Sequence, residues 1–141
     1  MQVYIVNGPN LNLLGIREPE MYGQTSFSSF LKILRSQCKD VEIHHIQSNA
    51  EHELIQAIHD AGKQNANGII INPGAFTHSS LAIADAIRAV NIPTIEVHVS
   101  HVFAREQARH VSKISSSCVG SISGLGLSGY RLALNFLTQN Q

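Results

Sequence analysis

The chain has 141 residues with 10 basic and 10 acidic side chains, and 43% of its residues are hydrophobic while only 14% are charged. This length predicts one domain with a substantial core, and the small share of charge predicts that other subunits cover part of the surface. The neutral balance argues against binding to nucleic acid or to an anionic membrane surface. The apolar runs are too short to span a bilayer, and the first begins directly after Met1, which leaves no room for a signal peptide.

Cysteine usage points to a reducing compartment. Cys38 and Cys118 are too few for a disulfide framework, and they form no C-x-x-C motif. We therefore expect two structural thiols in a cytoplasmic protein.

Short apolar runs alternate with amphipathic stretches along the whole chain, and they predict these elements in order: strand 2–7, helix 25–39, strand 41–46, helix 49–65 capped by Asn49, strand 68–71, helix 78–90, strand 93–97, strand 119–122 and helix 125–137. Apolar strands joined by crossover helices indicate a parallel sheet that is covered on both faces. We predict an α/β fold over residues 1–141: a flavodoxin-like three-layer sandwich with a five-stranded parallel sheet in the order 2-1-3-4-5.

A long loop follows the first predicted strand. Residues 7–24 are rich in Gly, Pro and Asn, and they carry Arg17 and Tyr22 five positions apart. A permanently charged guanidinium lowers the pKa of a nearby phenol, which can turn a tyrosine into a base. We therefore interpret residues from about 17 to 24 as a catalytic lid, with an ordinary surface turn as the alternative.

Polar residues follow three predicted strands that are neighbours in the proposed order. Ligands of such sheets bind beyond the carboxyl ends of the strands, near the switch in strand order. The side chains expected to converge there are Asn10, Asn72, His78, Glu96, His98 and Ser100.

Glu96 and His98 are two residues apart on a predicted strand, so their side chains face the same way. A carboxylate beside an imidazole fixes its tautomer and favours its protonated form, which suits a general acid. The alternative is a histidine whose hydrogen bonds are satisfied at a sheet edge and which has no catalytic role.

Arg105 and Arg109 lie at helical spacing around Glu106. They either hold an anionic substrate group or form an exposed ion-pair helix.

Other motifs predict no metal or nucleotide site. Residues 124–129 match G-x-G-x-x-G, but the motif follows the last strand, so a tight turn and close helix packing explain its glycines better. His52 and His59 are expected on a solvated helix face, and His44 and His45 point to opposite sides of a strand.

Sequence blocks along nearly the whole chain resemble, in order and spacing, the type II 3-dehydroquinate dehydratases. The blocks are Asn7-Gly8-Pro9-Asn10-Leu11-Asn12, Leu14-Gly15, Arg17, Pro19, Tyr22-Gly23, Asn72-Pro73-Gly74-Ala75 with His78, Glu96-Val97-His98-Val99-Ser100, Ala104-Arg105-Glu106, Gly124-Leu125-Gly126 and Gly129-Tyr130.

This resemblance implies the anti dehydration of 3-dehydroquinate to 3-dehydroshikimate through an enolate, in the shikimate route to aromatic amino acids, without cofactor or metal. It implies that Tyr22 is the base, Arg17 its activator and the transition-state stabiliser, and His98 the acid. Asn10 would hold a water against the enolate, and Glu96 would support His98.

The resemblance also implies how substrate is bound and how the chains assemble. The substrate-binding residues would be Asn72, His78, Val99, Ser100 and Arg109, with backbone amides of Val99 and Ser100 meeting the substrate carboxylate. Asp85 would reach the neighbouring subunit's site, in a dodecamer of stacked trimers.

This chain departs from the family pattern at His101, Phe103 and Ala108, where substrate affinity or subunit contacts could differ.

The alternative function is a flavodoxin-like module that binds a small anion or nucleotide without turnover. Against it, Pro9 removes an amide donor from the loop where such a module would cradle phosphate.

Overall fold

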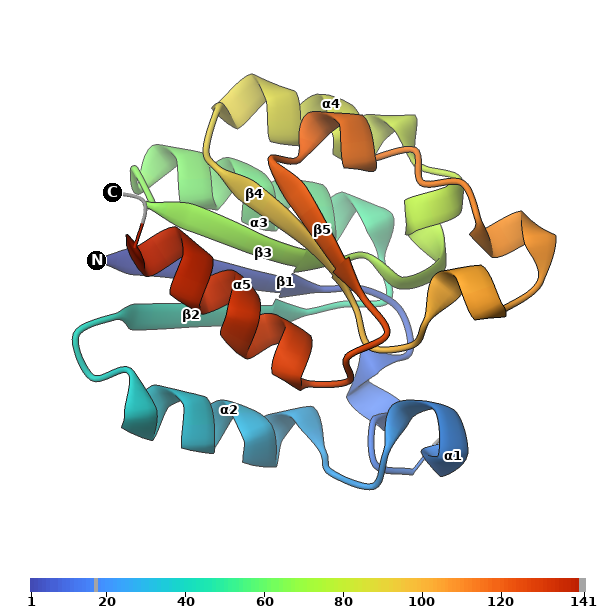
Figure 1. Cartoon of the computed structure of the whole chain (residues 1–141). Coiled ribbons are helices and arrows are strands. Elements are labelled where there is room, and N and C mark those ends of the chain that lie inside the picture. Colours follow the sequence, from blue (N-terminus) through green and yellow to red (C-terminus); the bar gives the residue numbers. More distant parts are fainter. Residues whose placement is uncertain (17, 140–141) are drawn as a thin grey trace.

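The computed structural model describes residues 1–16 and 18–139. Its five strands are β1 (Gln2–Asn7), β2 (Glu42–Gln47), β3 (Gly68–Asn72), β4 (Thr94–His98) and β5 (Gly120–Ser123). All pairings are parallel, and the sheet order is β2-β1-β3-β4-β5 (Figure 1). The α/β fold and the strand order predicted from the sequence are confirmed.

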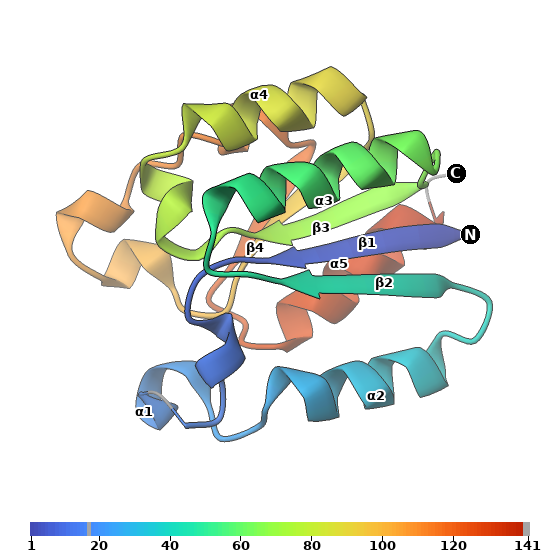
Figure 2. The same cartoon turned by 180° about the vertical axis from the view of Figure 1, so that it is seen from behind.

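The α-helices are α1 (Pro19–Tyr22), α2 (Phe27–Gln37), α3 (Glu51–Lys63), α4 (Leu81–Val90) and α5 (Ser128–Gln139). Short 3-10 turns lie at Leu11–Leu13, Gly74–His78, Val102–Ala104, Gln107–Arg109 and Ser115–Ser117. Helices α2 and α5 cover one face of the sheet, and α3 and α4 cover the other (Figures 1 and 2). None of the helices in the described residues combines the length and hydrophobicity that crossing a membrane would require.

Alternation along the central strands divides the core into two layers. On β1, Val3 and Ile5 face α2 and α5, whereas Tyr4 and Val6 face α3 and α4. Because both faces of β1 and β3 are covered, these strands are apolar almost throughout, as expected for a parallel sheet.

Side-chain caps fix where two helices begin. The Ser26 hydroxyl accepts from the Ser29 N–H at the start of α2, and the Ser80 hydroxyl accepts from the Ile83 N–H at 2.9 Å at the start of α4. The predicted start of the third helix at His78 was therefore too early, because His78 ends a 3-10 turn before the cap.

The prediction that Asn49 caps α3 is wrong. Ala50 occupies the N-cap position, and the side-chain oxygen Oδ1 of Asn49 accepts instead from the Asn10 N–H at 3.0 Å. Asn49 thus holds the loop that follows β1, at the end of the sheet where the polar residues gather.

Candidate active site

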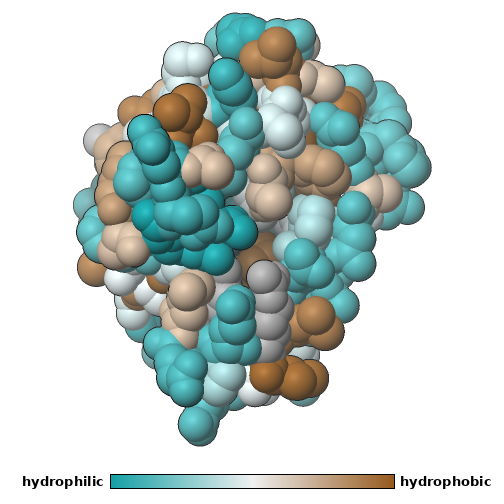
Figure 3. All heavy atoms as spheres, turned by 90° about the vertical axis from the view of Figure 1, so that its right-hand side faces the viewer, coloured by the Kyte–Doolittle hydropathy of each residue, from teal (hydrophilic) through white to brown (hydrophobic). Residues whose placement is uncertain are grey.

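A pocket opens at the carboxyl ends of β1, β3 and β4. It encloses about 660 Å³, part of which is open solvent. Hydrophilic and hydrophobic side chains are intermixed over this end of the molecule (Figure 3). The lining residues are Pro9, Asn10, Leu11, Leu13, Leu14, Asn72, Gly74, Ala75, His78, His98, Val99, Ser100, Val102, Arg105 and Arg109. The expected convergence at the switch in strand order is confirmed for Asn10, Asn72, His78, His98 and Ser100.

The ends of β1 and β3 are in close backbone contact at this pocket. The Gly8 N–H donates to the Asn72 carbonyl oxygen at 2.8 Å, and a Cβ on Gly8 would lie 2.4 Å from the Pro73 carbonyl oxygen. Only glycine permits this approach, which brings Asn10 beside Asn72. Asn10 itself has a φ of 69°, a left-handed conformation that asparagine tolerates better than most residues.

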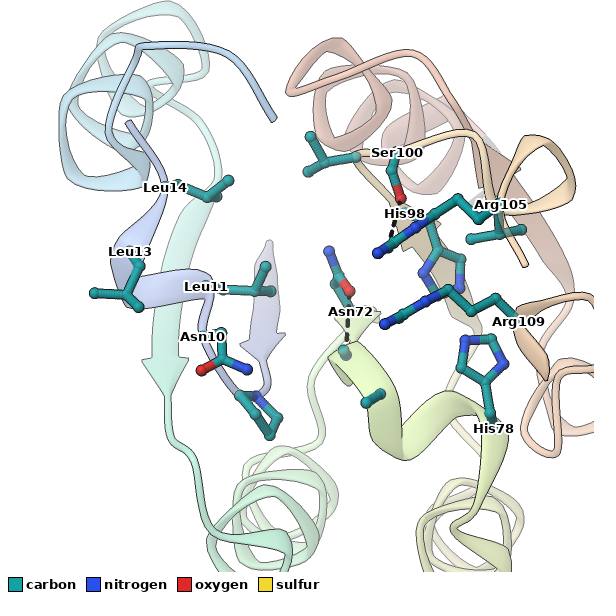
Figure 4. Close-up of a pocket in the computed structure, with 15 residues that line it drawn as sticks. Asn10, Leu11, Leu13, Leu14, Asn72, His78, His98, Ser100, Arg105 and Arg109 are labelled. Carbon is teal, nitrogen blue, oxygen red and sulfur yellow. Dashed lines mark hydrogen bonds between the residues drawn. The ribbon is translucent and has the colours of Figure 1, made fainter. Parts of the chain in front are cut away.

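The two walls of the pocket differ in chemistry. Leu11, Leu13 and Leu14 form an apolar wall with Asn10 at its base, and the guanidinium groups of Arg105 and Arg109 reach in from the opposite wall (Figure 4). An anionic ligand with an apolar ring or chain fits between these walls.

Glu96 and His98 form a buried pair. The Glu96 Oε1 lies 2.6 Å from the His98 Nε2, and the two residues are 2% and 8% exposed. Since a carboxylate only accepts, Nε2 carries a hydrogen, and Nδ1 remains as the ring nitrogen that can exchange a proton with a ligand. The predicted same-face arrangement is confirmed.

Glu96 is ionised in this setting. Its burial opposes the charge, but the hydrogen bond and charge of His98 outweigh burial, with help from Ser112 and Ser115, and lower the pKa of Glu96 below its usual value. The Ser112 hydroxyl donates to the second carboxylate oxygen, Oε2, at 3.1 Å. The carboxylate is therefore held from both sides and stabilises a positive charge on the imidazole.

His78 lies beside this pair. Its ring is nearly parallel to that of His98, with the ring centres 6.5 Å apart, and its Nδ1 donates to the Val111 carbonyl oxygen at 2.8 Å. This bond fixes the tautomer, so the neutral ring presents Nε2 as an acceptor.

The two arginines do not lie on a helix, because 102–104 and 107–109 form separate 3-10 turns. Arg109 lines the pocket and also pairs with Glu106 at 2.7 Å, so both interpretations of this residue hold in part. Arg105 lines the pocket as well, and its Nη1 donates to the Ser100 hydroxyl at 3.4 Å.

The glycine turn after β5 orients the backbone at the end of β4. Gly124 donates its N–H to the His98 carbonyl at 3.2 Å, and Gly126 donates to the Val99 carbonyl at 3.1 Å. In a trans peptide the next N–H points the opposite way, so the N–H groups of Val99 and Ser100 point away from this turn. Both residues line the pocket.

The G-x-G-x-x-G segment thus serves a turn and helix packing, as expected. Gly124 and Gly126 have φ values of 87° and 58°, which favour glycine. A Cβ on Gly129 would lie 3.1 Å from the Val97 side chain, so α5 begins close against the sheet.

Several predicted site residues are not placed in this pocket. Arg17 and the side chain of Tyr22 lie outside the described residues. Asp85 is on α4 with its side chain 69% exposed and paired with Arg88, and it does not line the pocket of its own chain.

The three positions that depart from the family pattern, His101, Phe103 and Ala108, are all exposed, and none lines this pocket. Phe103 packs edge-on against His101 and tilted against His110. Their side chains therefore form the outer surface of the arginine wall.

Sequence reasoning missed the leucine wall and Ser112. Leu11 and Leu14 are buried beside the polar loop, and apolar residues inside a Gly-, Pro- and Asn-rich segment were a usable signal for them. Ser112 reaches Glu96 from a loop 16 residues away in the chain, and no local pattern indicates that contact.

Comparisons with known proteins decide the family. A family model for dehydroquinase class II matches residues 1–138. The 3-dehydroquinate dehydratase of Caldicellulosiruptor saccharolyticus is 51% identical over 140 residues, which cover 98% of this chain and 97% of that protein. The chain belongs to the type II 3-dehydroquinate dehydratases. Enzymes of this family are hydro-lyases of the shikimate pathway, and the resemblance seen in the sequence is confirmed.

Further type II relatives agree in sequence and in structure. The 3-dehydroquinate dehydratase of Shewanella woodyi is 56% identical over 135 residues, which cover 94% of this chain and 89% of that protein. The crystal structure of type II dehydroquinase from Butyrivibrio crossotus matches with a TM-score of 0.95 at 43% identity, covering 98% of this chain and 97% of that chain.

Proposed function

We propose that the pocket at the ends of β1, β3 and β4 dehydrates 3-dehydroquinate to 3-dehydroshikimate by anti elimination through an enolate. The observation that carries this proposal is His98, which lines the same pocket as Arg105 and Arg109 and is held from behind by the buried Glu96 carboxylate. A β-hydroxyl leaves only when it is protonated, and His98 held by an ionised carboxylate is a suitable acid. Membership of the dehydroquinase class II family favours this enzyme over a module that binds a ligand without turnover.

The substrate carboxylate binds at the β4 end of the pocket. The N–H groups of Val99 and Ser100 and the guanidinium of Arg109 supply donors for it, while Asn72 and His78 contact the ring hydroxyls. The leucine wall covers the apolar face of the ring, so its reacting carbon and its leaving hydroxyl face opposite sides of the pocket.

The base comes from the lid. Tyr22, with its phenol activated by the Arg17 guanidinium, removes the proton beside the ketone, and a water held by Asn10 stabilises the enolate oxygen. A nearby positive charge lowers a phenol pKa by about one to three units. His98 then gives its Nδ1 proton to the hydroxyl, which leaves as water, and solvent later moves a proton from Tyr22 to His98.

Assembly completes the site in this proposal. Asp85 reaches the pocket of a neighbouring subunit in a dodecamer built from trimers, which is supported by its exposure away from its own pocket and by the low charge content of the chain. Light scattering after size-exclusion chromatography measures the assembly, and a monomer of full activity would contradict it.

We infer a cytoplasmic location from the thiols. Cys38 and Cys118 are free, and they pack against different core layers on opposite faces of the sheet. Burial, reinforced by the charge of Glu96, raises the pKa of Cys118 to about 12, so this side chain stays a protonated thiol.

The test is direct. In one arm, purified enzyme is incubated with 3-dehydroquinate and a chelator, and the conjugated enone product is followed by ultraviolet absorbance. In the other, the enzyme is treated with 3-dehydroquinate and borohydride, freed of both by gel filtration, and then assayed with fresh substrate. We expect product in both cases, because the mechanism uses neither a metal nor an imine that borohydride would reduce. Loss of activity with either reagent would contradict the proposal.

A further inference from the structure

A row of four polar side chains runs from the pocket through the core to the edge strand. Asn72 ends β3, Tyr130 lies on α5, Asn7 ends β1 and His45 lies on β2. The Asn72 Nδ2 donates to the Tyr130 hydroxyl at 3.1 Å, this hydroxyl donates to the Asn7 Oδ1 at 2.8 Å, and the Asn7 Nδ2 lies 3.2 Å from the His45 Nε2. The row begins at a residue that lines the pocket, so it connects the core to the site.

The row has one hydrogen-bonding direction. Tyr130 gives its single hydrogen to Asn7, so the oxygen of the Asn7 amide is committed, and its nitrogen donates to His45 as an acceptor. At the other end, the Asn72 Oδ1 accepts from the Gly74 N–H at 3.3 Å. The oxygen of the Asn72 amide and one of its two N–H groups are therefore engaged, and the second N–H remains for a ligand in the pocket that Asn72 lines. Figure 4 shows Asn72 in this pocket.

Burial makes this arrangement costly to change. Tyr130 and Asn7 are 0% exposed and Asn72 is 3% exposed. Phe27 packs against the Tyr130 ring edge-on at 4.9 Å, and it also contacts the ring of His45 at 4.7 Å. A flipped Asn72 amide would place its oxygen against Tyr130 and its nitrogen against the Gly74 N–H, which leaves buried polar groups without hydrogen-bond partners.

We propose that Tyr130 is a positioning residue for the dehydration: through its bonds to Asn72 and Asn7 it fixes the Asn72 amide with one N–H presented to the substrate. This inference rests on the proposed function, because it takes Asn72 as a substrate-binding residue. It assigns a role in the site to a tyrosine that lies in the core and does not line the pocket.

The first experiment removes one hydroxyl. In Tyr130→Phe the Asn72 amide loses its anchor, and we expect KM for 3-dehydroquinate to rise about 3- to 10-fold, the value of one neutral hydrogen bond. Turnover should change less than twofold, because a binding contact present before and during the reaction acts on KM rather than on kcat.

Tyr4→Phe is the matched control. Tyr4 is also a buried tyrosine, but it lies on β1, packs in the other core layer and stacks on His44. We expect its KM to equal that of the wild type. Equal changes in both variants would overturn the proposal, because they would show a general effect of losing a core hydroxyl.

A double-mutant cycle separates positioning from general stability. If Tyr130 acts through Asn72, then Tyr130→Phe changes KM less than twofold when Asn72 is already alanine. The same fold-change in both backgrounds would overturn the proposal. The measurements are made well below the unfolding temperature of each variant.

The outcomes also separate this inference from the proposed function. A normal KM in Asn72→Ala alone would overturn the role of Asn72 and this inference together. An impaired Asn72→Ala beside an unaffected Tyr130→Phe would overturn this inference alone.

If Tyr130→Phe does not fold, the native protein answers the same question by nuclear magnetic resonance. Adding 3-dehydroshikimate should shift one of the two Asn72 Nδ2 proton signals much more than the other, because the second proton is already bonded to Tyr130. Equal shifts of both signals would overturn the proposal.

Discussion

The site has two halves that are built in opposite ways. The strand-end half is made by the ends of β3 and β4, where Asn72, Glu96, His98 and Ser100 are all buried. The lid half follows β1, and its described residues from Glu18 to Met21 are exposed. In the proposed mechanism the acid and its carboxylate partner thus belong to the core, whereas the base belongs to a surface segment.

This difference follows from what each half has to do. A charged acid and a carboxylate need fixed partners, and a rigid sheet supplies them without reorganisation during the reaction. A tyrosine base must be desolvated beside its arginine only when substrate is present, which a closing lid can accomplish. We infer that closure both excludes water and creates the base, so the lid contributes to turnover with little effect on stability.

The largest expected effects come from removing one proton-transfer group from each half. His98→Ala and Tyr22→Phe should each lower kcat by about 10²- to 10⁴-fold, the usual contribution of a positioned acid or base. Only His98→Ala should also lower the unfolding temperature, because it leaves the buried Glu96 without its partner. Turnover and thermal denaturation are measured on both variants. Equal loss of stability in the two would contradict the inference that the lid half contributes little to stability.

A smaller effect is expected from Glu96→Gln, which keeps the shape and an acceptor for His98 but removes the charge. We expect kcat to fall about tenfold or more, because a neutral amide no longer stabilises the positive charge of the protonated imidazole. Turnover at saturating substrate tests this expectation.

Glu42→Gln is the control for the charge change. Glu42 also lies beside an imidazole, that of His44 at 3.2 Å, but on the edge strand away from the pocket. Its kcat should match that of the wild type, and an unchanged kcat in Glu96→Gln would remove the carboxylate from the mechanism.

The fold and the strand-end half could be predicted from the sequence because they follow from local periodicity and one topological rule. Buried runs such as 68–71 set the strands, the parallel order sets which ends meet, and alternation along β4 puts Glu96 and His98 on one side. What could not be predicted are contacts between distant segments. The hydrogen bond from Ser112 to Glu96 depends on where a distant loop meets the sheet, and the hydrogen bond between Asn72 and Tyr130 depends on where α5 packs against it.

Helix boundaries were missed for a related reason. Asn49 has the residue type of an N-cap, but its side-chain oxygen Oδ1 accepts from the Asn10 N–H across the chain, and that tertiary bond outweighs the local preference. The start of α4 was likewise decided by Ser80 rather than by the apolar pattern that reaches back to His78.

The smallest expected effect concerns acid stability, and it falls on the polar row that runs from His45 on β2 to Asn72 in the strand-end half. Burial, reinforced by the charge of Arg35, lowers the pKa of His45 to about 4, so the folded protein holds this imidazole neutral as the acceptor for Asn7. The unfolded chain binds the proton near its ordinary pKa of about 6.5. Between these values the unfolded state carries more protons, so this contribution to stability is complete above about pH 6.5 and is lost as pH falls toward about 4.

His45→Gln tests this effect, since glutamine keeps a carbonyl acceptor for Asn7 and does not titrate. We expect the unfolding temperature of the variant to fall less steeply than that of the wild type between about pH 6.5 and pH 4. His52→Gln, at an exposed position on α3, should leave the wild-type slope unchanged. If the curves of His45→Gln and wild type run parallel, His45 does not titrate with folding, and the buried row does not weaken the strand-end half in acid.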